Sequence, residues 1–310
     1  MGRGDLSDAE WERLRPLLPV SNRRCGRWRD HRQVIDGILH RVRTGVQWRD
    51  LPDRFGPWKT VYERHRLWSA DGTWERLLQQ VQAAADAAGE IDWDISVDST
   101  IVRAHQHAAG ARIDPPPMPG SKGAEEPEPP GRSAVAESAR PPGGGGAGGE
   151  SLGRSRGGFT SKLHLSADGR CRPLSLIVTP GQRADCTQFI AVLEKIRVPR
   201  PGLGRPRKKP YSLAADRAYS NGPVREYLRR RGVRHTIPEK SDSQAARLRK
   251  GARGGRPSGF DEDRYKKRNT VERAINRMKQ FRAVATRYDK RGYVFLGTAT
   301  AAAVAIWLRT

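Results

Sequence analysis

The stretch SKLHLSADGRCRPLSLIVT at residues 161–179 decides the fold class of this chain. Polar and apolar residues alternate from 161 to 166, which predicts a strand, and Ala167-Asp168-Gly169-Arg170 predicts a turn. The apolar run at 174–179 predicts a returning strand, so the stretch should form a hairpin. Around it the sequence predicts a strand at 94–99, a helix at 188–196, a strand at 211–215, a helix at 223–231, a strand at 233–237 and a helix from about 264 to 281. This order is typical of an α/β fold in which helices flank a sheet.

The region before the predicted sheet is expected to be helical. Ser7 followed by Glu10 forms a capping-box pattern that opens one helix. Apolar residues at helical spacing from 34 to 42, followed by Gly45, predict a second helix. Two more are expected from Pro57 onward and over 74–88, and the six tryptophans between residues 11 and 74 should anchor their core. The predicted division is a small all-helical domain at residues 1–90 followed by an α/β domain at residues 91–310.

Residues 114–150 differ in composition from both predicted domains. Of these 37 residues 18 are Gly or Pro, and none is aromatic, Leu or Ile. Such a segment cannot bury enough apolar surface to offset the entropy lost on ordering. We therefore expect a disordered insertion within the α/β domain.

The chain is strongly cationic. Its 310 residues include 58 Lys and Arg against 34 Asp and Glu, a formal net charge of +24. Residues 151–310 hold 37 cations and 12 anions, whereas residues 1–113 hold 18 and 16. A charge of this size indicates a polyanionic partner such as nucleic acid. The chain has no apolar run of about 18 residues and no signal-peptide pattern at Met1, so we expect a cytoplasmic protein without membrane spans.

The three cysteines favour neither a disulfide framework nor a zinc site, because they are widely spaced and form no Cys-x-x-Cys pair. His105 and His107 also lack further ligands at zinc spacing, so we interpret them as loop or DNA-facing residues. The eight arginines between residues 23 and 49 indicate either a solvated basic face or a DNA-contacting helix. The basic runs at 202–209 and 225–256 favour a surface that tracks phosphates, and the apolar stretch at 293–308 predicts a core helix.

Three acids stand out by position. Asp98 and Asp216 lie at the C-terminal ends of predicted strands, the edge where α/β proteins usually place their ligands. Glu272 lies on the predicted helix in one narrow stripe with a tyrosine and two cations, next to an apolar band. The members of this stripe are Tyr265, Arg268, Glu272 and Lys279.

The stripe has two interpretations. It is either a surface helix with an Arg268–Glu272 pair worth about 0.3–0.5 kcal/mol, or part of a catalytic site. Carboxylates from two strands and a helix can hold two Mg²⁺ or Mn²⁺ ions about 3.5–4 Å apart, which is a common device for phosphodiester chemistry. The catalytic interpretation accounts for all three acids, and the surface interpretation only for Arg268.

These residues carry a family resemblance. The four stripe residues fit Tyr-x2-Arg-x3-Glu-x6-Lys and resemble the signature of DDE transposases of bacterial insertion-sequence families four and five. Residues 97–100 (VDST) and 215–219 (ADRAY) are similar to the first two acidic regions of family five, and residues 153–162 (GRSRGGFTSK) resemble the segment between them. The stretches WRDLP at 48–52 and FGPW at 55–58 resemble the N-terminal domain of that family.

The resemblance implies a ribonuclease H-like catalytic domain, with a mixed sheet flanked by helices, in which Asp98, Asp216 and Glu272 are both the catalytic acids and the metal ligands. It implies metal-dependent cleavage at the ends of a mobile element, followed by transfer of the freed strand to target DNA, with two Mg²⁺ or Mn²⁺ ions as cofactors. It assigns Arg268 and Lys279 to DNA, and Tyr265 to the site or to a nucleotide. We also expect the helical domain at residues 1–90 to bind DNA. Its partners would be double-stranded DNA, as terminal inverted repeats and target, and a second copy of the chain on DNA.

Two alternatives remain open at this point. One is a DNA-binding protein or repressor derived from a transposase, without chemistry. The other is a ribonuclease H-like nuclease that hydrolyses strands but does not join them.

Overall fold

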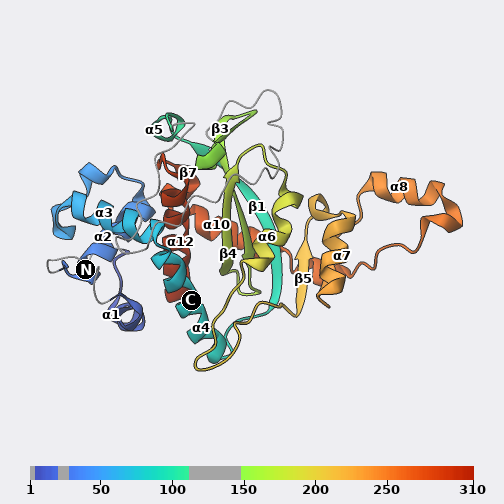
Figure 1. Ribbon diagram of the computed structural model, residues 1–310, viewed down its shortest axis with the longest axis horizontal. Helices are drawn as coiled ribbons and strands as arrows, with labels where there is room; N and C mark the ends of the chain where they lie inside the picture. The colour runs from blue at the N-terminus through green and yellow to red at the C-terminus, as the bar shows by residue number, and fades with distance from the viewer. Residues whose placement is uncertain (1–3, 20–27, 112–147) are drawn as a thin grey trace, which may run out of the picture.

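The computed structural model describes residues 4–19, 28–111 and 148–310, so nearly all of the predicted insertion at 114–150 lies outside the described residues. The centre of the molecule is a seven-stranded sheet (Figure 1). Its strands run in the order β2-β3-β1-β5-β6, with β4 also paired to β3 and β7 to β1. Their bounds are β1 Asp94–Ala104, β2 Gly153–Ser155, β3 Gly158–Ala167, β4 Pro173–Pro180, β5 Ser212–Ala215, β6 Arg234–Thr236 and β7 Thr286–Arg287.

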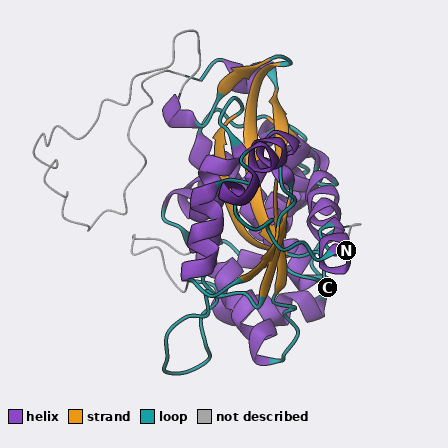
Figure 2. Cartoon of the chain, turned by 90° about the vertical axis from the view of Figure 1, so that its right-hand side faces the viewer, coloured by secondary structure: helices purple, strands orange, loops and turns teal. Residues whose placement is uncertain are grey.

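The sheet is mixed. β1, β3 and β4 pair antiparallel, whereas β1, β5 and β6 pair parallel. The predicted hairpin is confirmed, and Asp168 stabilises its turn by accepting the backbone N–H groups of Arg170 and Arg172 at 3.1 and 2.8 Å. Helices cover both faces (Figure 2). This arrangement confirms the predicted mixed sheet flanked by helices, as in a ribonuclease H-like domain.

The N-terminal helices also match the sequence. α1 (Asp8–Leu14) begins with the predicted capping box, in which Ser7 Oγ accepts the Glu10 N–H and Glu10 Oε2 accepts the Ser7 N–H. α2 (His31–Thr44) ends at Gly45, whose φ of +73° is the left-handed conformation that favours glycine. α3 (Trp58–Ala70) and α4 (Thr73–Ala87) follow.

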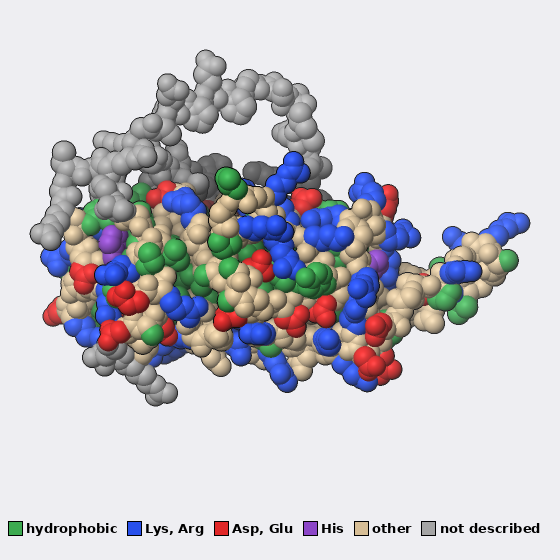
Figure 3. All heavy atoms as spheres, turned by 90° about the horizontal axis from the view of Figure 1, so that it is seen from below, with side chains coloured by type: hydrophobic (Ala, Val, Ile, Leu, Met, Phe, Trp, Pro, Cys, Tyr) green, Lys and Arg blue, Asp and Glu red, His purple; other side chains and the backbone are tan. Residues whose placement is uncertain are grey.

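The remaining helices connect the strands or cover the sheet. They are α5 Gln106–Ala109, α6 Phe189–Glu194, α7 Gly222–Arg230, α8 Ser241–Arg249, α9 Glu262–Lys266, α10 Asn269–Lys279, α11 Arg282–Ala285 and α12 Gly292–Leu308. α8 has no buried residue and projects from the end of the molecule opposite the N-terminal helices (Figure 1). In the space-filling view this projection carries Lys and Arg side chains (Figure 3).

α12 is the predicted core helix, and 15 of its 17 residues are buried. It packs against α2, α3 and α4 and also against β4 and α10. Small residues allow this close approach, since a Cβ added at Gly297 would lie 1.9 Å from Ser69 Oγ. No helix among the described residues is long and apolar enough to cross a membrane.

One hydrophobic core continues from the N-terminal helices into the sheet. Of the six N-terminal tryptophans, Trp68 and Trp74 are fully buried, and the other four are only partly buried against that core. A buried ion pair between Arg41 on α2 and Asp289 before α12 adds a polar link between the two parts. Asp289 Oδ2 also accepts the Thr298 hydroxyl at 2.9 Å.

Candidate active site

Asp98 and Asp216 occupy matching positions on neighbouring parallel strands. The β1–β5 pairing ends at Val97 opposite Ala215, and each acid is the residue that directly follows this last pair. Asp216 follows the end of its strand as predicted. The prediction that Asp98 ends a strand is wrong, because β1 remains paired with β3 on its other side as far as Arg103.

The Asp98 side chain is 23% exposed and has two partners. Its Oδ1 accepts the Ser99 backbone N–H at 2.8 Å, and its Oδ2 accepts Arg268 Nη1 at 3.2 Å. Burial raises the pKa of Asp98, and the negative charges of Asp216 and Glu272 raise it further, while the Ser99 N–H and the Arg268 guanidinium oppose this rise. Asp98 therefore shares one electrostatic environment with both other predicted acids.

Glu272 lies in the first turn of α10 and faces Arg268. The guanidinium contacts Glu272 Oε1 through Nη2 while it contacts Asp98 through Nη1, so a single side chain joins the two carboxylates. The Thr270 hydroxyl, 3.3 Å from Ser96 Oγ, holds the start of α10 against β1. The interpretation as a simple surface helix does not account for these contacts with β1.

The predicted continuous helix from 264 to 281 is instead two helices, α9 and α10. At the junction, backbone hydrogen bonds of the tighter i→i−3 kind replace regular α-helical bonds. The Arg268 N–H donates to the Tyr265 carbonyl, and the Val271 N–H donates to the Arg268 carbonyl. Tyr265 is therefore on α9, where its ring packs against Phe260 at 5.2 Å and lies under the Arg268 guanidinium. Lys279 ends α10, two turns and about 10 Å of helix beyond Glu272. The apolar band of the helix is buried as predicted: Val271, Ala274, Ile275, Met278 and Phe281.

The acids suit a hard cation by type. Carboxylate oxygens are preferred ligands of Mg²⁺ and Mn²⁺, and two of the three already converge on one cationic group, the Arg268 guanidinium. Within the described ranges, no three His, Cys, Asp or Glu side chains form a cluster that could hold an ion. An ion shared by Asp98 and Glu272 therefore requires the Arg268 side chain to move.

Sequence reasoning missed a fourth acid beside this site. Asp185 Oδ1 accepts the Ser99 hydroxyl at 2.7 Å and lies 2.9 Å from Lys162 Nζ. Tyr219 is buried nearby, and its pKa is raised by burial and by the charges of Asp98 and Asp185. Asp185 lies in a short helical turn after β4 without any motif, so only the fold reveals its proximity.

His105 and His107, interpreted from the sequence as loop or DNA-facing residues, lie away from the three acids. His105 caps α5 and packs against Tyr288 at 5.1 Å, and both line a cavity of about 640 Å³ with Trp48 and Trp58. His107 is exposed at the same cavity. Neither histidine contacts the acids.

The N-terminal arginines do not form one basic face. Arg41 is buried in its pair with Asp289, and Arg32 is held by Asp8 at 2.6 Å and by the Leu6 carbonyl at 2.9 Å. The part of the run at residues 23–27 lies outside the described residues. Within the described part, several of these arginines therefore have a structural role.

Comparison with known families gives two matches that together cover most of the chain. The family described as "Putative transposase of IS4/5 family" matches residues 6–78, and the family described as "Transposase DDE domain" matches residues 91–307. The second match alone spans well over half of the sequence.

Individual relatives agree with these matches. An uncharacterized protein, y4sN, of Sinorhizobium fredii is 40% identical over 108 residues, which are 34% of this chain and 82% of the relative. A "Putative transposase for insertion sequence element IS6501" of Brucella ovis is 28% identical over 151 residues, which are 49% of this chain and all of the relative. A "Putative transposase for insertion sequence element IS402" of Burkholderia cepacia is 28% identical over 131 residues, 42% of this chain and 54% of the relative. No solved structure matches the chain.

The two family matches, the mixed sheet and the relatives from insertion elements lead to one conclusion. The chain belongs to the IS4/IS5 family of DDE transposases.

Proposed function

We propose that this chain cleaves insertion-sequence DNA at its ends and transfers the freed strands to target DNA, with Asp98, Asp216 and Glu272 as catalytic acids. The observation that carries the proposal is the Arg268 bridge, which joins Asp98 to Glu272 across 174 positions of sequence (272 − 98). The β1–β5 register supports the inclusion of Asp216. The raised pKa of Asp98, caused first by burial and then by both other acids, gives further support.

We propose that the three acids hold two Mg²⁺ or Mn²⁺ ions, as divalent metals serve DDE transposases generally. When bound, such ions activate the attacking oxygen and stabilise the leaving oxygen. The chain itself orients the ligands, because Oδ1 of Asp98 accepts the Ser99 N–H and Oδ1 of Asp216 accepts the Arg217 N–H at 2.5 Å. In each aspartate, a backbone N–H thus holds Oδ1 and fixes the orientation of the carboxylate.

Cleavage and strand transfer are both in-line displacements at phosphorus, so one site can serve both. We assign Tyr265, Arg268 and Lys279 to DNA contacts. Arg268 can donate two hydrogen bonds to a phosphate once it leaves the carboxylates, and Lys279 extends the same side of α10. The substrates are double-stranded terminal repeats and target DNA, and a homodimer on DNA would bring two ends together.

The test uses the purified chain, Mg²⁺ and DNA that carries the terminal repeats of the element. We expect the wild type to cleave and join, and Asp98→Asn, Asp216→Asn and Glu272→Gln to bind DNA without cleaving it. Glu194→Gln, which removes an exposed acid on α6, is the matched control and should cleave normally.

The two alternatives give different results in the same assay. Cleavage without joining would indicate a nuclease, and binding without cleavage by the wild type would indicate a transposase-derived DNA-binding protein. Normal cleavage by the three acid variants would refute the assigned site.

A further inference from the structure

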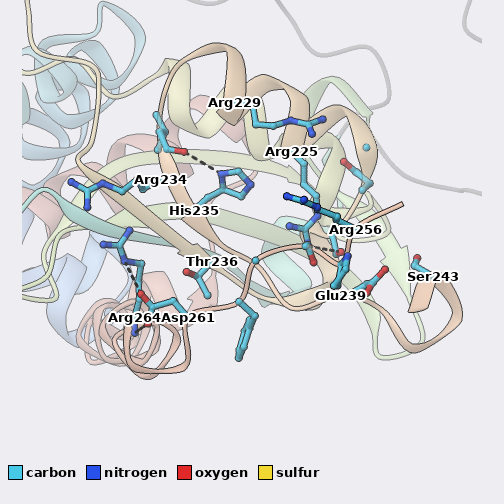
Figure 4. Close-up of a pocket in the computed structure, with 18 of the residues that line it drawn as sticks. Arg225, Arg229, Arg234, His235, Thr236, Glu239, Ser243, Arg256, Asp261 and Arg264 are labelled. Carbon is cyan, nitrogen blue, oxygen red and sulfur yellow. Dashed lines mark hydrogen bonds and ion pairs between the residues drawn. The ribbon is translucent and has the colours of Figure 1, made fainter. Parts of the chain in front are cut away.

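A large cavity adjoins the candidate active site. It has a volume of about 1080 Å³ and lies between α7, β6 and residues 256–264 (Figure 4). Residues 220–222, which follow the turn after Asp216, form part of its wall, and Arg264 lies four residues before Arg268. β6 runs parallel to β5 with Thr236 opposite Ala214, so its end opens to the same edge of the sheet as Asp216. The cavity therefore lies next to the acids both along the chain and across the sheet.

The lining is rich in arginine and poor in compensating charge. Five arginines and two acids line the cavity: Arg225, Arg229, Arg234, Arg256, Arg264, Glu239 and Asp261. Glu239 already pairs at 3.2 Å with Arg247, which is not part of the lining, and Asp261 caps α9 by accepting the Arg264 N–H at 3.0 Å.

Three of these arginines combine exposure with a lack of ion pairs among the described residues. Arg229, Arg234 and Arg256 are exposed, and within the part of the chain that the structure describes none of them forms an ion pair. The cavity therefore presents three guanidinium groups that no acid of the described ranges neutralises, which favours a ligand with several negative charges.

The arrangement of the arginines indicates an extended ligand. In Figure 4, Arg234 and Arg264 lie at one side of His235 and Thr236, and Arg225 and Arg256 lie at the other. A strand of nucleic acid presents one phosphate per nucleotide and can meet both pairs.

An aromatic surface distinguishes an unpaired strand from a duplex. Phe260 lines the cavity, is 50% exposed and packs against Tyr265, which lies beside Arg268. Exposed aromatic rings next to cations bind unpaired bases by stacking, whereas the bases of a duplex are already stacked on one another. The Phe260 ring thus offers a base-binding surface between the arginines and the acids.

We propose that this cavity binds one unpaired DNA strand beside the catalytic acids, with its phosphates on Arg229, Arg234 and Arg256 and a base on Phe260. The inference rests on the proposed function, because cleavage at the acids releases a strand end that can separate from its complement and enter the cavity.

The test measures binding of a fluorescent single-stranded oligonucleotide to the full chain in EDTA, where cleavage does not interfere. Each phosphate contact to a single strand contributes about 0.7 to the slope of log affinity against log salt, so three contribute about 2. Between about 50 and 200 mM salt, the wild type should therefore lose about 20-fold more affinity than the variant R229Q/R234Q/R256Q. The control R170Q/R197Q/R200Q removes three exposed arginines that lie outside the basic runs 202–209 and 225–256, in the β3–β4 turn and before β5, and should keep the wild-type slope.

Phe260 provides an independent measurement. Phe260→Ala should weaken single-strand binding about 5- to 150-fold, and Phe260→Trp should restore it, because stacking depends on the ring and not on charge. Circular dichroism of each variant verifies that it is folded.

Two outcomes would overturn the proposal. One is a triple variant with the wild-type salt slope, and the other is an equal loss of affinity for duplex and single strand. The variant Asp98→Asn, measured in both assays, distinguishes failure of this proposal from failure of the proposed function. It should bind the single strand normally and fail only in cleavage.

Discussion

Replacement of Arg41 by methionine should destabilise the whole chain, because it leaves a buried carboxylate without its main partner. Arg41 Nη2 lies 3.0 Å from Asp289 Oδ1, Nη1 lies 3.5 Å from Oδ2, and the side chains are only 3% and 5% exposed. Removal of one member of a buried pair costs about 3–5 kcal/mol. Asp289 keeps the Thr298 hydroxyl and the nearby charge of Arg287, so we expect the lower end, about 3 kcal/mol.

Urea and thermal unfolding, followed by tryptophan fluorescence and far-UV circular dichroism, measure this loss. At about 2–4 °C per kcal/mol, the melting temperature should fall by roughly 6–12 °C. Arg66→Met is the matched control, because Arg66 pairs with Glu63 at 2.8 Å in a partly exposed pair on one helix. Its free energy of unfolding should change by less than about 1 kcal/mol.

A double-mutant cycle separates the pair from other effects of Arg41. Asp289→Asn should also destabilise, and the double variant should lose less than the sum of the single losses, by up to about 3 kcal/mol. Losses that simply add, or an Arg41→Met variant as stable as wild type, would refute the reasoning. Because the pair and the core both connect α2 to the region before α12, fluorescence and dichroism should report one transition in the wild type.

Three further predictions follow from single contacts. In the metal-free chain, Asp98 should protonate at a higher pH than an ordinary carboxyl, and Arg268→Gln should raise the pKa of Asp98 further, because Arg268 lowers it. The carboxyl carbon resonance of Asp98, followed by NMR against pH, measures this, and a titration that Arg268→Gln leaves unmoved would contradict the contact. Gly297→Val should cost about 1–3 kcal/mol in thermal unfolding because its side chain meets Ser69, while Gly110→Ala, with open space around it, should be neutral. Ser7→Ala should cost about 1 kcal/mol in urea unfolding through loss of the α1 cap, and Ser7→Thr should not; equal losses would argue against the cap.

The strands and helices of the sheet region could be predicted largely from local pattern, but their ends could not. The hairpin at 161–179 shows alternation and a turn, and both strands are present. The predicted strand ends at residue 99, five residues before the end of β1 at Ala104, although Thr100, Ile101 and Val102 are strand formers. What extends β1 is pairing with β3 across the insertion, and this long-range contact leaves no local signal at Asp98.

The same limit applies to the candidate site. The spacing of Tyr265, Arg268, Glu272 and Lys279 predicted one continuous helix, and the break between α9 and α10 could not be foreseen because it contains neither Gly nor Pro. Contacts with β1 provide a physical reason for the break, since Lys267 lies 3.6 Å from Asp94 and Arg268 reaches Asp98. Four of the five cavity arginines, Arg225, Arg229, Arg234 and Arg256, lie in the basic run 225–256, but the cavity itself could not be predicted, because its walls come from three separate segments.

The positive charge that first indicated nucleic acid is not a measure of DNA-binding surface. Arg172 is buried between Asp168, the Glu90 carbonyl and the Trp307 ring, and burial lowers the pKa of Arg287 to about 10. Such arginines hold the scaffold together, and their removal would reduce DNA binding only through unfolding. Arg229, Arg234 and Arg256 are exposed and have no ion-pair partner among the described residues, so a charge-removing variant there tests binding itself. For this chain, an arginine should therefore be assigned to DNA when it is exposed and unpaired among the described residues, and not by its place in a basic run alone.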